Sequence, residues 1–398
     1  MRKDFVSVLR IKDFLIFTSG QTVSQFGEKM VNLALIALVG VYAKGSPAAL
    51  SKLAVSISLP VILFAPLVGV AVDRLNRKKA IIFSELGRAL LILTIPLVMV
   101  CMHSLFAIYI FAFFIFLYAL IFNTSKLSII PNLVPTDKLL GANSVCSFAV
   151  RTATVVGLLG GGYLIDWWGW QKSFYINSLF FIGSASIFTQ IFVGFKNRTR
   201  SKLTFFSDLK EGFTLVFKER KVLFVMGVSF LLCLVGASVY VLIVNIVQQE
   251  LGKGTGGIGM LGGILAIGTL IGAFLFGMTG RRFKKKRVIL FAFLILGIIF
   301  AGFSLCKNFI FFILLSFLAG IVMTPITISQ DTILHETLRE EIRGRIFGIK
   351  DWILNLFFAI SSVTLGIIAT VTSVRATLFG TGCLIAVLSV LGMWRIRK

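Results

Sequence analysis

Long apolar runs dominate this chain of 398 residues and restrict the folds that it can adopt. Each run holds roughly 20 residues, the length that an α-helix needs to cross the hydrocarbon core of a bilayer. Strands of a membrane barrel are about ten residues long and alternate in polarity, which these runs do not. The sequence therefore predicts membrane-spanning helices. The twelve expected spans cover residues 14–42, 51–72, 80–101, 104–125, 139–165, 173–195, 221–247, 256–279, 288–305, 308–332, 346–371 and 375–394.

The composition indicates a chain that is solvated by lipid. Hydrophobic residues make up 57% and charged residues only 14%, with a mean hydropathy of +0.97. The first apolar run is longer than the apolar core of a signal peptide, so we expect it to remain as a span. A formal charge of +24 raises nucleic acid as a partner. The basic residues stand at the ends of apolar spans, however, and not in a soluble binding module, so the expected partner is the bilayer and not nucleic acid.

The basic residues divide unevenly between the alternate loops. One set of loops, together with both ends of the chain, holds most of the 40 Lys and Arg residues. Loops rich in Lys and Arg stay in the cytoplasm of multi-pass proteins. We therefore expect a multi-pass protein of the plasma membrane, the inner membrane in a bacterium, with both termini cytoplasmic.

The longest polar link lies at the middle of the chain. It separates an N-terminal bundle of six spans (residues 1–195) from a C-terminal bundle of six (residues 221–398), with a cytoplasmic linker over 196–220. The basic segment that begins at Gly69 recurs in part from Gly277, again between the second and third spans of its half. This duplication predicts an all-α membrane protein, a transporter of two pseudo-symmetric bundles.

Residues 69–79 carry a motif, Gly-Val-Ala-Val-Asp-Arg-Leu-Asn-Arg-Lys-Lys. The motif resembles the signature loop of the major facilitator superfamily, which has glycine, three residues, Asp-Arg, one residue, glycine and then basic residues. The matching positions are Gly69, Asp73, Arg74 and Arg77. Asn76 replaces the second glycine, and we interpret this as a residue that readily adopts left-handed backbone. The resemblance implies a cytoplasmic latch onto the start of the eleventh span, near residues 344–347; a plain basic loop is the alternative.

The fifth span contains a glycine-rich segment, residues 157–162, with the sequence Gly-Leu-Leu-Gly-Gly-Gly. It is similar to the Gly-Pro-x-x-Gly-Gly segment of antiporters in the same superfamily. Gly157, Gly161 and Gly162 match, whereas Leu158 stands where the family has proline. Small residues also let helices approach closely, so simple packing is the alternative interpretation.

Along its whole length the chain resembles the efflux branch of this superfamily, which includes macrolide-efflux and enterobactin-exporter-like proteins. The features that carry the resemblance are Gly27-Glu28, Glu85-Leu-Gly-Arg88, Ile130-Pro131 with Pro135, and Gly344-Arg345. The resemblance implies the major facilitator fold and export of an organic solute.

A polar stripe follows one face of the first span. Its members, at steps of four, three and four, are Gln21, Gln25, Glu28 and Asn32. Glu28 lies roughly 20 Å into the span, near the midplane, where an ionisable residue is costly and marks a candidate functional site. We predict that Glu28 couples transport to protons; a structural carboxyl with a basic partner is the alternative. Arg151, at similar depth in the fifth span, is the hypothesised partner, or both residues share an anionic substrate.

Two further groups of charges are assigned to a cytoplasmic gate. Glu85 and Arg88 are three residues apart, so they can interact on one helix face, either as part of the gate or as a plain salt bridge. Asp331 ends the tenth span, and Lys350 and Asp351 open the eleventh. These shallow positions predict gating or capping roles.

Taken together, these patterns predict a secondary active transporter that exports a hydrophobic or amphipathic organic solute in exchange for protons. No nucleotide-binding loop occurs, so an ion gradient is the expected energy source. We expect a monomer without a cofactor. We also expect no metal, because neither the five cysteines nor His103 and His335 have the spacing of a metal site. An intramembrane enzyme is disfavoured because neither histidine has an acidic partner. A non-coupled facilitator or uptake carrier for a lipid or metal ion, and a transporter-like receptor, remain as alternatives.

Overall fold

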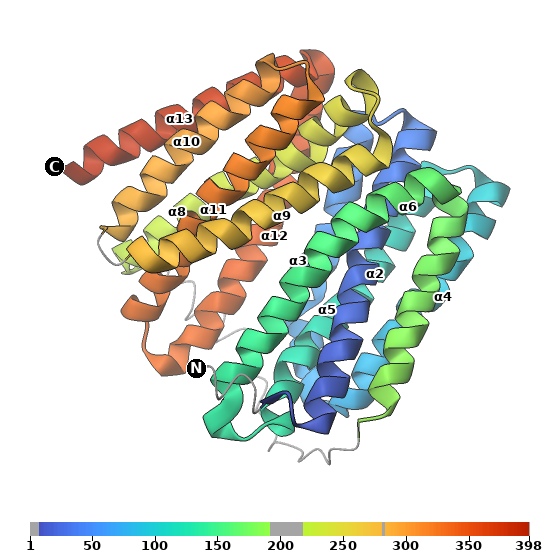
Figure 1. Ribbon diagram of the computed structural model, residues 1–398. Coiled ribbons are helices and arrows are strands. Elements are labelled where there is room, and N and C mark those ends of the chain that lie inside the picture. The colour runs from blue at the N-terminus through green and yellow to red at the C-terminus, as the bar shows by residue number, and fades with distance from the viewer. Residues whose placement is uncertain (1–7, 192–217, 281–282, 398) are drawn as a thin grey trace. The chain divides into compact units, whose positions relative to one another are not determined.

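The computed structural model describes residues 8–191, 218–280 and 283–397. Some side chains within its helices lie outside this description, among them those of Asp73, Arg74, Gly344 and Arg345. All regular elements of the described ranges are helices, and Figure 1 shows them coloured along the chain. The predicted linker, residues 196–220, lies mostly outside the described residues.

The helices follow one another with short connections. The first half contains α2 (Lys12–Ala43), α3 (Pro47–Arg74), α4 (Arg77–Met102), α5 (Leu105–Leu133), the short η1 (Thr136–Lys138) and α6 (Leu139–Thr189). The second half contains α8 (Arg220–Ala237), η2 (Ser238–Ile243), η3 (Ile246–Glu250), α9 (Gly254–Thr279), α10 (Lys285–Leu305), α11 (Phe309–Thr337), α12 (Glu340–Val371) and α13 (Val374–Arg397).

Eleven helices in the described ranges are long and apolar enough to cross a membrane. One of them, α6, consists of two helices joined at Gly169, whose backbone is not helical (φ 76°, ψ 163°). Gly169 lies between the fifth and sixth predicted spans. The chain can leave the helical conformation at this residue because glycine adopts positive φ without steric cost. The prediction of twelve spans is therefore confirmed. A regular helix over 221–247 was expected, but η2 and η3 are π-helical turns.

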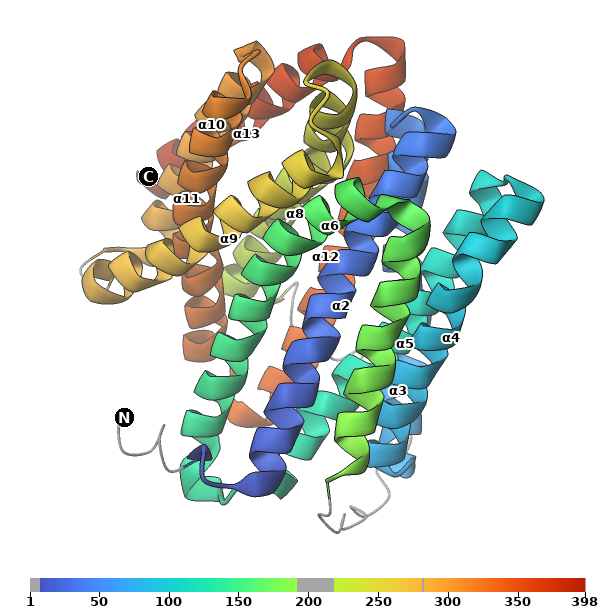
Figure 2. The ribbon, with the colours of Figure 1, turned by 45° about the vertical axis from the view of Figure 1, so that its right-hand side comes forward.

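Two compact units make up the chain. The first comprises Met1–Tyr42 with Leu59–Leu203, and the second comprises Ala43–Ser58 with Thr204–Lys398. Within the first unit, the two arms of α6 flank α2 (Figure 2). A Cβ atom on Gly157 of one arm would lie 3.1 Å from Lys29 Cβ, and one on Gly27 of α2 would lie 3.1 Å from Asn177 Oδ1 of the other arm. Glycine thus permits close packing of α2 on both sides.

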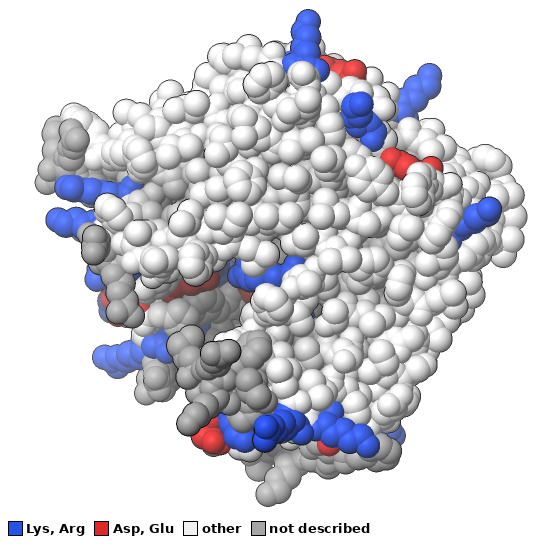
Figure 3. All heavy atoms as spheres, viewed as in Figure 1, with Lys and Arg blue, Asp and Glu red and all other residues white. Residues whose placement is uncertain are grey.

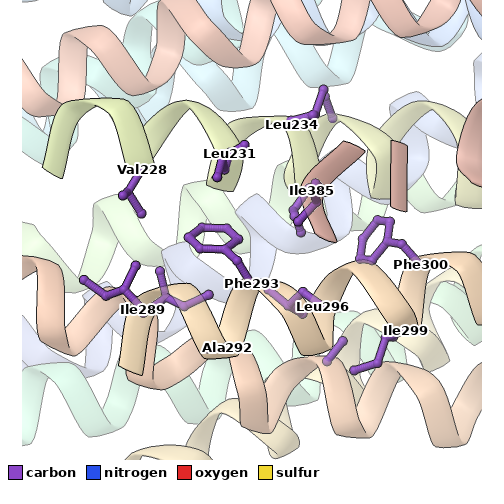
Figure 4. Close-up of a cluster of buried hydrophobic side chains, with 14 of the residues drawn as sticks. Val228, Leu231, Leu234, Ile289, Ala292, Phe293, Leu296, Ile299, Phe300 and Ile385 are labelled. Carbon is purple, nitrogen blue, oxygen red and sulfur yellow. The ribbon is translucent and has the colours of Figure 1, made fainter. Parts of the chain in front are cut away.

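The second unit has an apolar core between α8, α10 and α13. Side chains of α8 and α10 point toward one another there, with Ile385 of α13 beside them (Figure 4). Glycines bring other helices into contact: a Cβ atom on Gly272 of α9 would lie 2.6 Å from Ile321 O of α11. Another on Gly297 of α10 would lie 2.6 Å from Gly382 O of α13. A Cβ atom on Gly268 of α9 would likewise collide with Phe317 O of α11.

The connection between α2 and α3 belongs to the second unit. Asn245 Nδ2 donates a hydrogen bond of 2.7 Å to Gly45 O, and Ser51 Oγ donates one of 2.7 Å to Ser362 O. Gly45 has positive φ (60°), which glycine tolerates best. Residues 43–58 are therefore held by polar contacts to helices of the second half.

The signature loop differs in one detail from its prediction. Asn76 has extended backbone (φ −67°, ψ 112°), and its side chain accepts hydrogen bonds from the backbone N–H groups of Lys78 and Lys79. The ability of asparagine to adopt left-handed backbone is therefore not what lets it replace glycine here. Asparagine caps the first turn of α4, a role for which its short amide side chain is well suited.

Side-chain chemistry at the surface matches a membrane protein. On the face shown in Figure 3, broad areas carry no charged side chain. Large apolar side chains are exposed on the described part of the protein, including Leu97, Phe106 and Ile310. Exposure of so much apolar area is unfavourable in water and favourable in lipid.

A buried charged cluster as the candidate functional site

The polar stripe of the first span forms as predicted on α2. Glu28 lies near the middle of this 32-residue helix. Gln25 Nε2 donates a hydrogen bond of 3.1 Å to Glu28 Oε1 from one turn away. Gln21 is buried, with 3% of its surface exposed, and Asn32 is partly buried. The stripe therefore faces protein along most of its length.

A second pair of charges stands opposite, on α4. Glu85 and Arg88 are both fully buried, and the guanidinium Nη2 of Arg88 forms a salt bridge with Glu85 Oε1. Ser24 of α2 links the two helices, because its Oγ donates to Glu85 Oε1 at 2.9 Å and accepts from Arg88 Nη2 at 3.2 Å. The predicted interaction of Glu85 with Arg88 is confirmed.

Arg88 also approaches the carboxylate of Glu28. Arg88 Nη1 lies 3.6 Å from Glu28 Oε2, and Lys29 Nζ lies 3.6 Å from Glu28 Oε1. The hypothesised partner of Glu28, Arg151, is exposed instead, so the proposed pairing of these two residues is wrong. Sequence depth alone could not tell which face of the fifth span Arg151 occupies.

Two aromatic rings enclose the guanidinium. The Cζ atom of Arg88 lies 4.8 Å from the ring centre of Phe122 on α5 and 4.5 Å from that of Phe181 on α6. Cation–π attraction of this kind strengthens when the cation is removed from water. Lys126, one turn after Phe122, adds a further cation, with Nζ 5.6 Å from the Phe122 ring centre. We call Glu28, Lys29, Glu85, Arg88 and Lys126 the charged cluster.

Several buried polar atoms around this cluster lack a hydrogen-bond partner among the described residues. They are Glu85 Oε2, Arg88 Nε and Nη1, Gln21 Oε1, and both Oδ1 and Nδ2 of Asn177. Asn177 is fully buried and lies against Gly27, one turn before Phe181 on the same arm of α6. Buried polar groups are nearly always hydrogen-bonded, so these atoms are candidates for binding a ligand.

The residues assigned to the gate do not form one group. Arg77 begins α4, and the side chains of Asp73 and Arg74 lie outside the described residues, so that part of the latch stays a prediction. A Cβ atom on Gly69 would meet no heavy atom within 4 Å in the described structure. Glu85 and Arg88 lie in the first half of α4 and belong to the charged cluster, and their gate role stays a prediction.

In the second half, two of the charges that were predicted to lie near the ends of their spans pair with each other. Lys350 Nζ of α12 forms a salt bridge of 2.5 Å with Asp331 Oδ1 of α11. Lys350 is buried and Asp351 next to it is exposed. This pair connects two helices of the second unit, which suits the predicted capping or gating role.

The glycine-rich segment of α6 packs on α2 beside the cluster. A Cβ atom on Gly157 would also lie 3.3 Å from Phe26 O, and one on Gly161 would lie 3.4 Å from Met30 Cβ. Gly162 is buried. The segment therefore allows α6 to approach α2 at the level of Glu28 and Lys29.

Sequence reasoning missed four residues of this site. Ser24 and Asn177 are small polar residues within apolar spans and gave little signal. Lys29 and Lys126 are charges within or at the end of a span, a signal that could have been used, since such residues are rarely placed there without a partner. None of the described residues forms a group of three or more His, Cys, Asp or Glu side chains that could hold a metal ion.

Among the described residues, eleven apolar helices, one of them divided at Gly169, and a charged cluster in the first unit indicate a multi-pass transporter of the major facilitator type. The family described as "Transmembrane secretion effector" matches residues 5–397, and the chain belongs to this family. Family membership also makes it a transporter and not an enzyme.

Relatives and solved structures agree with this membership. An uncharacterised MFS-type transporter, YfiS, from Bacillus subtilis is 25% identical over 399 residues, covering 96% of this chain and 92% of the relative. A proposed bacilysin exporter, BacE, from Bacillus subtilis is 25% identical over 354 residues, 88% of this chain and 87% of the relative. The fold is similar to that of the nucleoside transporter NupG (TM-score 0.76, 13% identity, 97% of this chain and 100% of that one). It is also similar to that of a bacterial homologue of the lysosomal transporter Spinster (TM-score 0.76, 14% identity, 96% and 95%).

Proposed function

We propose that this protein exports a hydrophobic or amphipathic organic solute by alternating access, and that a proton moves in the opposite direction through Glu28. The family description and the name of the BacE relative both concern secretion or export, which supports the direction. The single observation that carries the coupling is an ionisable carboxylate in the middle of a membrane-spanning helix, beside two cations.

The geometry of Glu28 suits a carboxylate that exchanges partners. Its cations lie at 3.6 Å, beyond a direct charge-assisted hydrogen bond, and 18% of its side chain is exposed. Glu85, in contrast, is fully buried and bonds directly to Arg88 and Ser24. Glu85 is therefore the fixed counter-charge of Arg88, and Glu28 the exchangeable one. A proton on Glu28 releases Lys29 and the free side of Arg88, so that proton binding is linked to rearrangement between α2 and α4.

The remaining expectations complete the proposal. Gly69, Asp73, Arg74 and Arg77 form the cytoplasmic latch implied by the resemblance, onto the start of the eleventh span near residues 344–347, and Asp351 belongs to the same cytoplasmic gate. The transporter works as a monomer in a bacterial inner membrane with both termini in the cytoplasm, and the boundary between its bundles lies within residues 196–220.

The solute is to be identified first by a stability screen of the purified protein over drugs, macrolides, siderophores and lipids, because a ligand that binds the native state raises its apparent stability. Transport is then measured in liposomes with an imposed pH gradient. We expect uphill flux of the solute in the wild type and in Glu336→Gln, and none in Glu28→Gln. Glu336 is a suitable control because its carboxylate pairs with Lys285 at an exposed position.

One alternative has a specific observation in its favour. Glu28 already has two cationic neighbours, as a purely structural carboxylate would. A facilitator in which Glu28 is structural would carry the solute only down its own gradient, at a rate independent of the pH gradient. That outcome would reject the proton coupling while leaving the transporter class intact.

A further inference from the structure

The charged cluster carries an excess positive charge. Lys29, Arg88 and Lys126 are cations, and only Glu28 and Glu85 are carboxylates. Lys126 interacts electrostatically with Glu28, Arg88 and Lys29, and Glu85 joins them through its salt bridge with Arg88. An uncompensated charge away from water is unfavourable, and a negative group brought to this set is therefore attracted.

The unpartnered atoms indicate which kinds of group fit. Arg88 Nε and Nη1 are donors without a hydrogen-bond partner, on a guanidinium with no exposed surface, and Nη1 is only 3.6 Å from Glu28 Oε2. Glu85 Oε2 is an acceptor without a donor, and the Asn177 amide offers both kinds. A ligand group that both accepts and donates hydrogen bonds satisfies this set better than a group that only accepts.

We infer that the charged cluster binds a zwitterionic group of the transported solute, a carboxylate with an amino group close to it. The solute carboxylate binds the free side of Arg88 and Lys126 and compensates the excess positive charge. The solute ammonium binds Glu28, the carboxylate that is partly exposed. The Asn177 amide, next to Gly27, lies where it can hydrogen-bond the same group.

This inference rests on the proposed antiport, which requires the solute and the proton to compete for one site. An ammonium on Glu28 competes with a proton there, whereas a purely anionic solute binds better once Glu28 is protonated and so travels with the proton. A purely cationic solute is repelled by the excess positive charge. A group with both charges competes with the proton for Glu28 through its ammonium and compensates the excess positive charge through its carboxylate.

A binding experiment tests the charge preference without transport. The probes are phenylalanine, leucyl-phenylalanine and phenylalanyl-phenylalanine, each as the zwitterion, the N-acetylated anion, the amidated cation and the doubly blocked neutral form. Thermal stability of the purified full-length protein is measured against the concentration of each probe. We expect the zwitterion of at least one scaffold to bind about tenfold more tightly than its other three forms, as expected for a charge-assisted hydrogen bond. Equal binding of all four forms, a preference for a cation or an anion, or no binding by any scaffold would overturn the inference.

Two variants locate the binding. Lys126→Gln removes one cation and is expected to weaken zwitterion binding by about tenfold, whereas Lys285→Gln, which changes a partly exposed lysine of the second unit, leaves it unchanged. If Lys126→Gln does not fold, Asn177→Ala replaces it with the same expectation. Failure of the proposed function is distinguishable from failure of this inference. If the zwitterion binds but no pH-driven flux is found, the proposed antiport is rejected. If pH-driven flux is found for a solute whose binding does not depend on its charges, the inferred zwitterion site is rejected.

Discussion

Arg88 is the side chain on which the charged cluster depends. It bonds to Glu85 and Ser24, approaches Glu28, and lies between two aromatic rings, with no exposed surface. A buried guanidinium stays charged, so it needs a carboxylate in every state of the transport cycle. Glu85 supplies that carboxylate here, which leaves Glu28 available for exchange.

Replacement of Arg88 by methionine is expected to destabilise the protein by about 3–5 kcal/mol, because Glu85 would keep a buried charge without a partner. The double variant Glu85→Leu/Arg88→Met should recover much of this loss, since removal of both charges also removes the cost of burying them. Unfolding of the purified variants in detergent measures both effects. A double variant no more stable than Arg88→Met would contradict the pairing.

Among the helices, α2 is held in position by close contacts with the two arms of α6. The two arms of α6 approach it through Gly157 and Gly161 on one side and through Asn177 and Phe181 on the other. This close approach brings the arms to the level of Glu28. The close packing of α6 on α2 at Gly157 and Gly161 therefore helps to position Glu28.

Substitution of Gly157 by leucine is expected to destabilise the first unit by roughly 1–3 kcal/mol, because the new side chain would meet Lys29 and the backbone of Phe26. Gly160→Leu is the matched control on the same helix, since a Cβ atom there meets nothing within 4 Å. Thermal unfolding of the two variants tests this difference. An equal loss of stability in the two variants would show that close packing at Gly157 does not stabilise the first unit.

The end of α6 depends on a residue of the signature loop. Lys78 Nζ donates hydrogen bonds of 2.7 Å to Thr189 O and of 2.7 Å to Ile191 O, at the C-terminal end of the helix. Cations stabilise helix C-termini by about 0.3–1 kcal/mol at partly exposed positions. Lys78→Met should lower stability by about that amount and the neighbouring exposed Lys79→Met by less, as measured by unfolding in detergent. A larger effect at Lys79 would argue against this capping role.

What the sequence could predict at this scale depended on information within single helices. Apolar length and basic loops predicted the spans, and spacing predicted both the stripe on α2 and the interaction of Glu85 with Arg88. The meeting of Glu28 with Arg88 depends on how α2 and α4 are rotated about their own axes, which neither helix encodes alone. For the same reason Arg151 was assigned as a partner although its side chain is exposed, and Asn177 was overlooked.

At the scale of the whole molecule, the charges that bear on function are unequally divided. The first unit contains the charged cluster, whereas Ala237, the counterpart of Glu28 when Gly236 of α8 is aligned with Gly27 of α2, is a buried apolar residue in the second. The π-helical turns that follow it are a local departure from regular helix of a kind often found at functional sites. The proposed proton coupling therefore concerns the first unit, and the second unit contributes packing and polar contacts to residues 43–58.

The central claim is that Glu28 couples solute movement to protons, and the most direct measurement separates exchange from coupling in Glu28→Gln. Liposomes are loaded with unlabelled solute for the exchange assay or given a pH gradient alone for the accumulation assay. We expect Glu28→Gln still to exchange labelled for unlabelled solute, at a higher solute concentration because the contact with the solute ammonium is lost, but no longer to accumulate it with the pH gradient, while Glu336→Gln does both. Undiminished pH-driven accumulation by Glu28→Gln would show that Glu28 does not couple transport to protons.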